Sequence, residues 1–160
     1  MPNLRIFNTL SGHQEIFRAR KNKVGIYVCG ITPYDVTHLG HAFTYVFFDV
    51  VARYLRSLGH DATYVQNVTD IDDDILKRAT RDKIGWRKLA EMNTVKFLSD
   101  LKWLNVGLPD HYPHATDHIR EMIAIIRTLL RKKVAYVKNG SVYFSVSKVP
   151  EYGKLSKLSR

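Results

Sequence analysis

The stretch VGIYVCGITPYDVTHLGH, residues 24–41, decides the fold that we predict for this chain. Its first part, residues 24–29, is rich in β-branched and apolar side chains, which favours a buried strand. Gly30 and Pro33 interrupt that strand, and apolar side chains then recur at helical spacing over residues 47–58. The stretch therefore predicts a strand, a sharp loop and a long helix.

The start of the predicted helix carries two histidines and a glycine, His38, Gly40 and His41. The first turn of a helix offers unpaired backbone N–H groups and the positive end of the helix dipole, and both attract phosphate. Two imidazoles add side-chain donors, and the glycine lets a nucleotide approach the backbone. The short pattern alone also fits a capped surface turn, but its place after a buried strand favours a nucleotide site.

A second strand over residues 62–68 follows the helix, and Thr69 or Asp70 is expected to cap the next one. Strand, helix and strand at this spacing form a right-handed crossover unit of a parallel sheet. Ligands of such sheets gather at the carboxyl ends of the strands. The loops at residues 29–41 and 67–73 are therefore expected to face one pocket.

The remaining segments complete an α/β fold. Residues 1–23 suggest an edge strand or hairpin, and residues 86–104 have helical spacing. Residues 119–130 give the clearest amphipathic helix of the sequence. Two short apolar runs flank Asn139-Gly140, which is a strong hairpin signal.

The composition fits a soluble, globular protein of one domain. A chain of 160 residues with 45% hydrophobic side chains can bury a sizeable core, and no apolar run is long enough to span a membrane. The N-terminus shows no charged leader with an apolar segment, and a single cysteine forms no internal disulfide, so we expect a cytoplasmic location. The net charge of +10 is compatible with a nucleic-acid or nucleotide partner, although a basic solvated surface also explains it.

Several motifs resemble one enzyme family. HLGH at residues 38–41 looks like the HIGH signature of class I aminoacyl-tRNA synthetases, and YVCGITPYD at 27–35 is similar to the preceding segment of cysteinyl-tRNA synthetases. YVQNVTDIDD at 64–73 resembles the strand of that family that ends in TDIDD. IFNTL at 6–10 and YGKLS at 152–156 also match, so the resemblance covers essentially the whole chain.

The resemblance implies the chemistry of cysteine activation. His38 and His41 would hydrogen-bond the phosphates of ATP while the cysteine carboxylate attacks the α-phosphorus, and Gly40 would let adenine lie close to the backbone. Gly30 and Thr69 would contact the cysteine. ATP is then a substrate used with Mg²⁺, and the complete enzyme would transfer cysteine to tRNA(Cys).

Cys29, at the end of the first predicted strand, is the candidate metal ligand. Composition alone favours a small buried hydrophobic residue. The resemblance instead implies that it is one of four zinc ligands, and that the zinc binds the thiolate of the substrate. The other ligands of family members, a cysteine, a histidine and a glutamate, fall beyond residue 160, so we do not expect stoichiometric zinc binding by this chain.

Other suggestive clusters are interpreted as structural. We interpret three histidines as loop and capping residues: His111, His114 and His118. A proline breaks their helical register, and no thiol or carboxylate pattern completes a metal site with them. The carboxylates of residues 72–74 suit the first turn of a helix better than a magnesium site. KLSKL at residues 154–158 is taken as a basic tail and not as the second class I signature, KMSKS.

We therefore predict the N-terminal part of a cysteinyl-tRNA synthetase. Residues 1–105 would form the first half of the HIGH-type nucleotide-binding fold, a Rossmann-like parallel sheet with helices. Residues 106–160 would form a helix, a hairpin and the beginning of the connective insertion. The KMSKS loop, the second half of the fold and an anticodon-binding domain are missing, so the chain alone is expected to be incomplete for catalysis.

Three other functions stay open at this point. A mycothiol cysteine ligase shares the same motifs and passes activated cysteine to an amino sugar. A small HxGH nucleotidyltransferase would use the same histidines, and a non-catalytic relative would bind nucleotide without turnover. In a synthetase fragment, a sheet edge left exposed where the missing half should pair would favour self-association.

Overall fold

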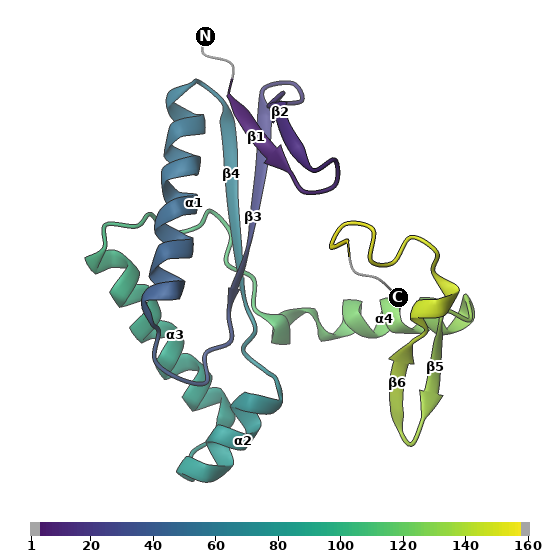
Figure 1. The fold of residues 1–160 in the computed structure, drawn as a ribbon. Coiled ribbons are helices and arrows are strands. Elements are labelled where there is room, and N and C mark those ends of the chain that lie inside the picture. Colours follow the sequence, from purple (N-terminus) through teal and green to yellow (C-terminus); the bar gives the residue numbers. More distant parts are fainter. Residues whose placement is uncertain (1–3, 158–160) are drawn as a thin grey trace. The chain divides into compact units, whose positions relative to one another are not determined.

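The computed structural model describes residues 4–157 and has the predicted α/β fold (Figure 1). The chain forms two compact units: the sheet unit, Ala19–Asp117, and the terminal unit, which joins Met1–Arg18 to His118–Arg160. Among the described residues, no helix is long and apolar enough to cross a membrane. The division predicted at residue 105 stays a prediction.

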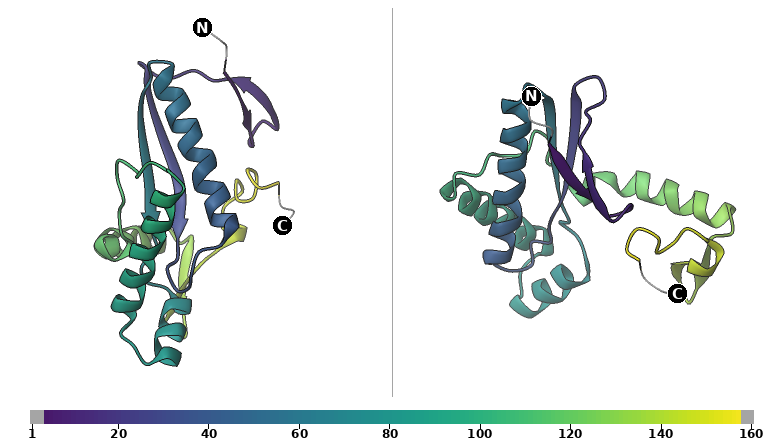
Figure 2. Two further views of the ribbon diagram at one scale, coloured as in Figure 1. Left: turned by 90° about the vertical axis from the view of Figure 1, so that its left-hand side faces the viewer. Right: turned by 45° about the horizontal axis from the view of Figure 1, so that its top comes forward.

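The sheet unit is built on the parallel strands β3 (Lys23–Ile31) and β4 (Asp61–Val68), which α1 (Leu39–Ser57) connects. Alternate residues along β4 are buried, as a strand with one face in the core requires. The helix α1 runs alongside both strands, so that its N-terminus and the carboxyl ends of the strands lie at the same end of the sheet (Figure 2). The predicted parallel crossover is confirmed.

The chain returns to the free edge of β4 after α3 (Trp86–Trp103). The Gln66 N–H donates to the carbonyl oxygen of His111 at 3.1 Å, and the Val68 N–H donates to that of Pro113 at 3.0 Å. This short parallel segment extends the sheet where the sequence suggested a loop. Within residues 4–157, no strand pairs with the outer edge of β3.

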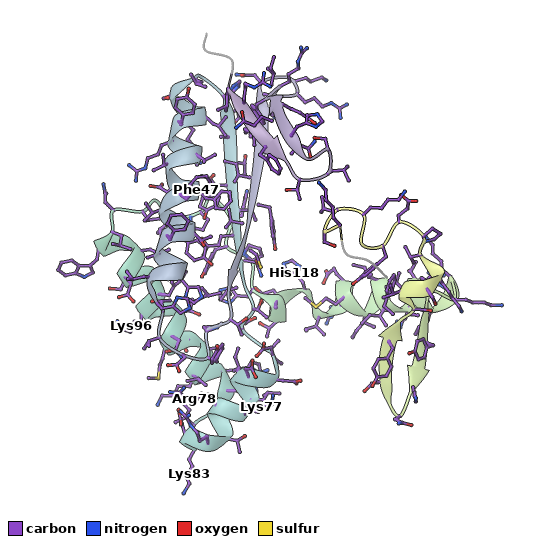
Figure 3. The ribbon with its side chains drawn as sticks, in the orientation of Figure 1. Phe47, Lys77, Arg78, Lys83, Lys96 and His118 are labelled. Atoms are coloured by element: carbon purple, nitrogen blue, oxygen red, sulfur yellow. The ribbon has the colours of Figure 1, made fainter. Side chains whose placement is uncertain are left out.

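The core of the sheet unit lies between one face of the sheet and the helices α1 and α3. Its buried members are Val28, Ile31, Tyr64 and Val68 from the strands, Tyr45 from α1, Phe97 and Leu101 from α3, and Val106. Because strand side chains alternate, Tyr27 and Cys29 face away from this core and are exposed. On α1, Phe47 is likewise more than half exposed (Figure 3).

Helix α2 (Asp73–Asp82) packs against α3 and begins at a different cap from the one predicted. Asp72 is the N-cap, and its Oδ1 atom accepts from the backbone N–H groups of Asp74 at 2.9 Å and Ile75 at 3.0 Å. The prediction of Thr69 or Asp70 is wrong because both are engaged elsewhere. The Thr69 N–H continues the sheet ladder, and the Asp70 carboxylate accepts from Thr116.

The described part of the terminal unit holds two hairpins and a helix. Its elements are β1 (Arg5–Asn8), β2 (His13–Ile16), α4 (Ile119–Arg131), β5 (Ala135–Lys138) and β6 (Ser141–Phe144), and the short 3₁₀ helices of the chain are η1 (Ala115–His118) and η2 (Val146–Lys148). Asn139 and Gly140 have φ angles of 51° and 79°, as the tight turn between β5 and β6 requires. The predicted β5–β6 hairpin and the amphipathic helix are confirmed. Of the two alternatives given for the N-terminal segment, an edge strand or a hairpin, the structure has the hairpin.

Candidate functional site

Histidine side chains cap the N-terminus of α1. His38 is the N-cap residue, and its Nδ1 atom accepts a hydrogen bond from the Gly40 backbone N–H at 3.1 Å. His41 Nδ1 accepts from the His38 backbone N–H at 3.4 Å, and the two rings stack with centroids 4.1 Å apart. The two bonds form a capping box in which imidazoles replace the usual hydroxyl and carboxylate.

These capping bonds fix the tautomer of both rings. Because Nδ1 accepts in each ring, the proton of the neutral imidazole sits on Nε2. Partial burial, together with the neighbouring His38, lowers the pKa of His41 and so favours its neutral form. Each ring therefore carries an Nε2–H donor at a helix N-terminus, where the dipole also attracts anions.

Gly40 is required by the same arrangement. A Cβ atom at this position would lie 2.9 Å from Cε1 and 3.0 Å from Nδ1 of His38, so a side chain would push the ring from its capping position. The glycine is also exposed, which leaves its backbone open to a ligand. The structure thus brings His38, Gly40 and His41 together as predicted.

Side chains of α2 and α3 hold the loop that carries the capping box. Arg78 lies on α2 (Figure 3). Its Nη1 atom lies 2.6 Å from Oδ2 of Asp35. Asn93 of α3 donates from Nδ2 to the carbonyl oxygen of Pro33 at 3.1 Å. The loop is therefore bonded to two helices before α1 begins.

A hollow of about 540 Å³ opens beside the two histidines. It is lined by Thr37, His38, Leu39, His41 and Ala42 at the start of α1, and by Phe97, Asp100, Leu101, Trp103 and Leu104 at the end of α3. On the wall of this hollow, Thr37 Oγ1 donates a hydrogen bond to Asp100 Oδ2 at 3.0 Å. Its volume lies within the range of roughly 300–1,000 Å³ that is usual for ligand pockets.

The other predicted site residues lie at the carboxyl ends of β3 and β4, the end of the sheet where α1 begins (Figure 1). The Gly30 N–H donates to Asn67 Oδ1 at 2.9 Å, and the Thr69 N–H donates to the Ile31 carbonyl at 2.9 Å. Cys29 is exposed, so its interpretation as a buried hydrophobic residue is wrong. The reason is that side chains alternate along a strand: Val28 of β3 points into the core, so the thiol of Cys29 points away from it.

A comparison with protein families identifies the domain. The family model for the catalytic domain of class I (C) tRNA synthetases matches residues 15–160. This chain belongs to that family. The cysteine–tRNA ligases of Haemophilus influenzae and Pasteurella multocida are 51% and 52% identical to it over 156 residues, which are 96% of this chain and 34% of each relative. This chain thus spans about a third of the length of these relatives.

Solved structures show the same fold over most of this chain. Mycobacterium tuberculosis methionyl-tRNA synthetase bound by methionyl-adenylate matches with a TM-score of 0.62 at 16% identity, over 80% of this chain and 30% of that one. A second structure of that enzyme in complex with methionyl-adenylate gives 0.60 at 18% identity, over 76% and 29% of the two chains. The predicted class I, Rossmann-like fold is confirmed.

The described residues of this chain do not complete a zinc site. Within residues 4–157, no group of three or more histidine, cysteine, aspartate or glutamate side chains could hold a metal ion. Zinc sites in proteins use three or four such donors. Cys29 alone therefore does not fit a zinc ion.

Among the clusters interpreted as structural, Asp72 and His114 make local contacts with their side chains. Asp72 caps α2, with the next two carboxylates in its first turn. His111 lies beside β4, and His114 Nδ1 lies 3.4 Å from Oδ2 of Asp70. His118 occupies the N-cap position of α4 without a capping bond from its side chain. A ligand role is assigned to none of them.

Sequence reasoning missed Tyr45 and Asn67. Tyr45 fits the apolar spacing of α1, yet its hydroxyl donates to the carbonyl oxygen of Cys29 at 3.2 Å, and burial raises the pKa of that hydroxyl, which keeps it protonated. Asn67 contacts Gly30 from the neighbouring strand. The only sequence signal for Asn67 is its low strand propensity among β-branched neighbours.

Proposed function

We propose that this chain supplies the phosphate-binding donors and part of the amino-acid site for ATP-dependent activation of cysteine. In the complete ligase the activated cysteine would pass to tRNA(Cys). The observation that carries this proposal is the pair of Nε2–H donors on His38 and His41, held by the capping box at the sheet end where Thr69 lies. Identity of 51% to a protein named cysteine–tRNA ligase supports cysteine as the amino acid.

In the proposed reaction, a carboxylate oxygen of cysteine attacks the α-phosphorus of ATP. The bond from that phosphorus to the bridging oxygen breaks, which gives cysteinyl-adenylate and pyrophosphate. Negative charge spreads over the phosphate oxygens in the transition state, and fixed donors such as His38 and His41 stabilise it most there. Mg²⁺ would enter with the phosphates of ATP and neutralise part of their charge.

The distribution of charge supports tRNA as the partner of the complete ligase. Residues 118–160 contain ten lysines and arginines against two glutamates, whereas residues 19–117 are nearly balanced, with thirteen basic and twelve acidic side chains. On α4, Arg120, Arg127 and Arg131 are exposed and share one helix face by their spacing. Clustered basic side chains bind the phosphate backbone of nucleic acids. The proposed tRNA-binding surface is therefore on the terminal unit.

Binding to the 160-residue chain tests the proposed activation site. Titration calorimetry would compare ATP with two non-hydrolysable adenylate analogues, cysteinyl-sulfamoyl-adenosine and its seryl counterpart. We expect the cysteinyl analogue to bind, and a His38→Ala/His41→Ala double variant to lose at least about a hundredfold in affinity, since each of the two lost bonds to a charged group is worth about 1.5–3 kcal/mol.

Two results would overturn the proposal. If a folded wild-type chain bound neither ATP nor the analogues, the proposed nucleotide-binding site would be refuted. Binding of ATP with no further gain from the cysteinyl group would instead indicate a nucleotide-binding domain that does not recognise the amino acid.

A further inference from the structure

The peptide that joins Cys29 to Gly30 leaves the sheet ladder. The parallel register runs through Val28 and Gln66 and resumes at Ile31 and Val68, so that β3 carries an extra residue between these pairs. An extra residue of this kind is a β-bulge, which redirects the side chains beside it. The bulge lies directly at the strand end that carries the exposed thiol.

Side chains take over both hydrogen bonds of this peptide. Its carbonyl, on Cys29, accepts from the Tyr45 hydroxyl at 3.2 Å. Its N–H, on Gly30, donates to Asn67 Oδ1 at 2.9 Å. The two strands also approach so closely here that a Cβ at Gly30 would lie 1.4 Å from the backbone oxygen of Asn67. The bulge is therefore held from α1 on one side and from β4 on the other.

The bond from Gly30 sets the orientation of the Asn67 amide. An N–H group needs an acceptor, so the oxygen of the amide faces Gly30 and the nitrogen faces the other way. That nitrogen, Nδ2, lies 3.5 Å from Thr69 Oγ1, at the long end of the hydrogen-bond range. Since Nδ2 can only donate, the proton of the Thr69 hydroxyl is turned away from Asn67.

We propose that Asn67 is a positioning residue for cysteine recognition, which couples the Gly30 backbone to the Thr69 hydroxyl and makes that hydroxyl a hydrogen-bond donor toward the substrate. Gly30 and Thr69, the expected cysteine contacts, come from different strands, and the Asn67 side chain contacts both. The group recognised is an acceptor on the amino acid, such as an oxygen of its carboxyl or acyl group. This inference rests on the proposed function.

Asn67→Asp separates this role from simple support of the bulge. An aspartate still accepts from the Gly30 N–H, so the strand ends keep their geometry. Its second oxygen also accepts, so it draws the Thr69 hydroxyl proton toward itself and reverses the polarity of that bond. If Asn67 only supports the bulge, Asn67→Asp should leave the affinity for the cysteinyl analogue unchanged. If Asn67 makes Thr69 a donor toward the substrate, the change should weaken that affinity.

The experiment measures dissociation constants of the 160-residue chain for cysteinyl-sulfamoyl-adenosine and for ATP. The variants are Asn67→Asp, Thr69→Val and the two combined. We expect Asn67→Asp and Thr69→Val each to weaken the cysteinyl analogue about tenfold while ATP changes less than about twofold. The double variant should bind no worse than Thr69→Val alone, because Asn67 acts through the threonine.

Asn22 offers a matched control. Its Nδ2 atom donates to the carbonyl oxygen of Gly59 at 2.7 Å, a side-chain bond to backbone at the opposite end of β3. We expect Asn22→Ala to lower the melting temperature without changing the ratio of the two dissociation constants. The amide proton resonance of Gly30 should stay downfield, as in a hydrogen-bonded amide, in Asn67→Asp and should move upfield in Asn67→Ala, so it reports whether the bond is kept.

The outcomes distinguish the two proposals. If the wild-type chain binds neither ligand, the proposed function fails and this inference fails with it. If the wild type binds both and Asn67→Asp keeps its affinity for the cysteinyl analogue, or if the effects of the two single variants add, only the role of Asn67 is refuted.

Discussion

Replacing His38 by asparagine separates the two functions that the structure gives this side chain. In α1, Nδ1 of His38 accepts from the Gly40 N–H at 3.1 Å, which is the task of an N-cap. The Nε2–H on the other side of the ring is the proposed phosphate donor. Asparagine is among the best N-cap residues and keeps the acceptor, but its shorter side chain lacks a donor at the position of Nε2.

The expected changes in unfolding free energy and in ATP affinity follow from the usual values for a helix cap and for a hydrogen bond to a charged group. His38→Asn should leave the free energy of unfolding within about 0.5 kcal/mol of wild type, whereas His38→Ala should lose about 1 kcal/mol, the usual cost of deleting a cap. For ATP, both variants lose a hydrogen bond to a charged group, so we expect affinity to fall at least tenfold in each.

Urea unfolding and ATP titration, carried out on the same protein samples, check this prediction. A stable His38→Asn variant with wild-type affinity for ATP would refute the phosphate-donor role. An asparagine variant as unstable as the alanine variant would refute the capping argument, and with it the assignment of the tautomer.

Three further predictions concern the strand end, the second histidine and the metal. Gly30→Ala should cost about 3 kcal/mol or more in unfolding free energy, because its Cβ would lie 1.4 Å from the Asn67 oxygen, whereas Gly25→Ala on the same strand meets nothing within 4 Å and should be tolerated. Comparable melting temperatures for the two variants would contradict this. Because the folded-state pKa of His41 lies below its ordinary value of 6.5, the neutral ring stabilises the fold above about pH 6.5 and this stabilisation is lost as the pH falls through the lowered value. Urea unfolding between pH 5 and 8 should show a smaller pH dependence in His41→Gln than in wild type, and equal slopes would count against the argument. Elemental analysis of the purified chain should find no stoichiometric zinc, since within residues 4–157 Cys29 belongs to no group of three or more side chains that could hold a metal ion; one tightly held zinc per chain would disprove it.

The β3–α1–β4 crossover and the β5–β6 hairpin were predictable because their signals are local. Buried strands, a long helix and an Asn-Gly turn each follow from short-range periodicity and turn preferences. The segment beside β4 was not predictable in this way. Its backbone at His111 and Pro113 pairs with a strand more than forty residues earlier, and its own residues show no strand pattern.

The same distinction between local signals and tertiary contacts holds for the candidate site. The position of His38, Gly40 and His41 followed from their place after a buried strand. The use of Nδ1 for capping, which fixes the tautomer, did not, since it depends on how the two rings fold back on the first turn. Composition alone favoured a buried Cys29, which the structure contradicts, because composition says nothing about which strand face a residue occupies.

By itself, the sequence determined the order of the elements, the parallel crossover and the motifs that resemble cysteinyl-tRNA synthetases, because each depends on residues close together in the chain. Only the tertiary structure decided which side chains support the site. Asn67 reaches Gly30 across 37 positions and Tyr45 reaches Cys29 across 16, and these contacts exist because a bulge takes one peptide out of the sheet ladder. A displaced peptide must find side-chain partners when it is shielded from water, and only the three-dimensional packing determines which ones are near.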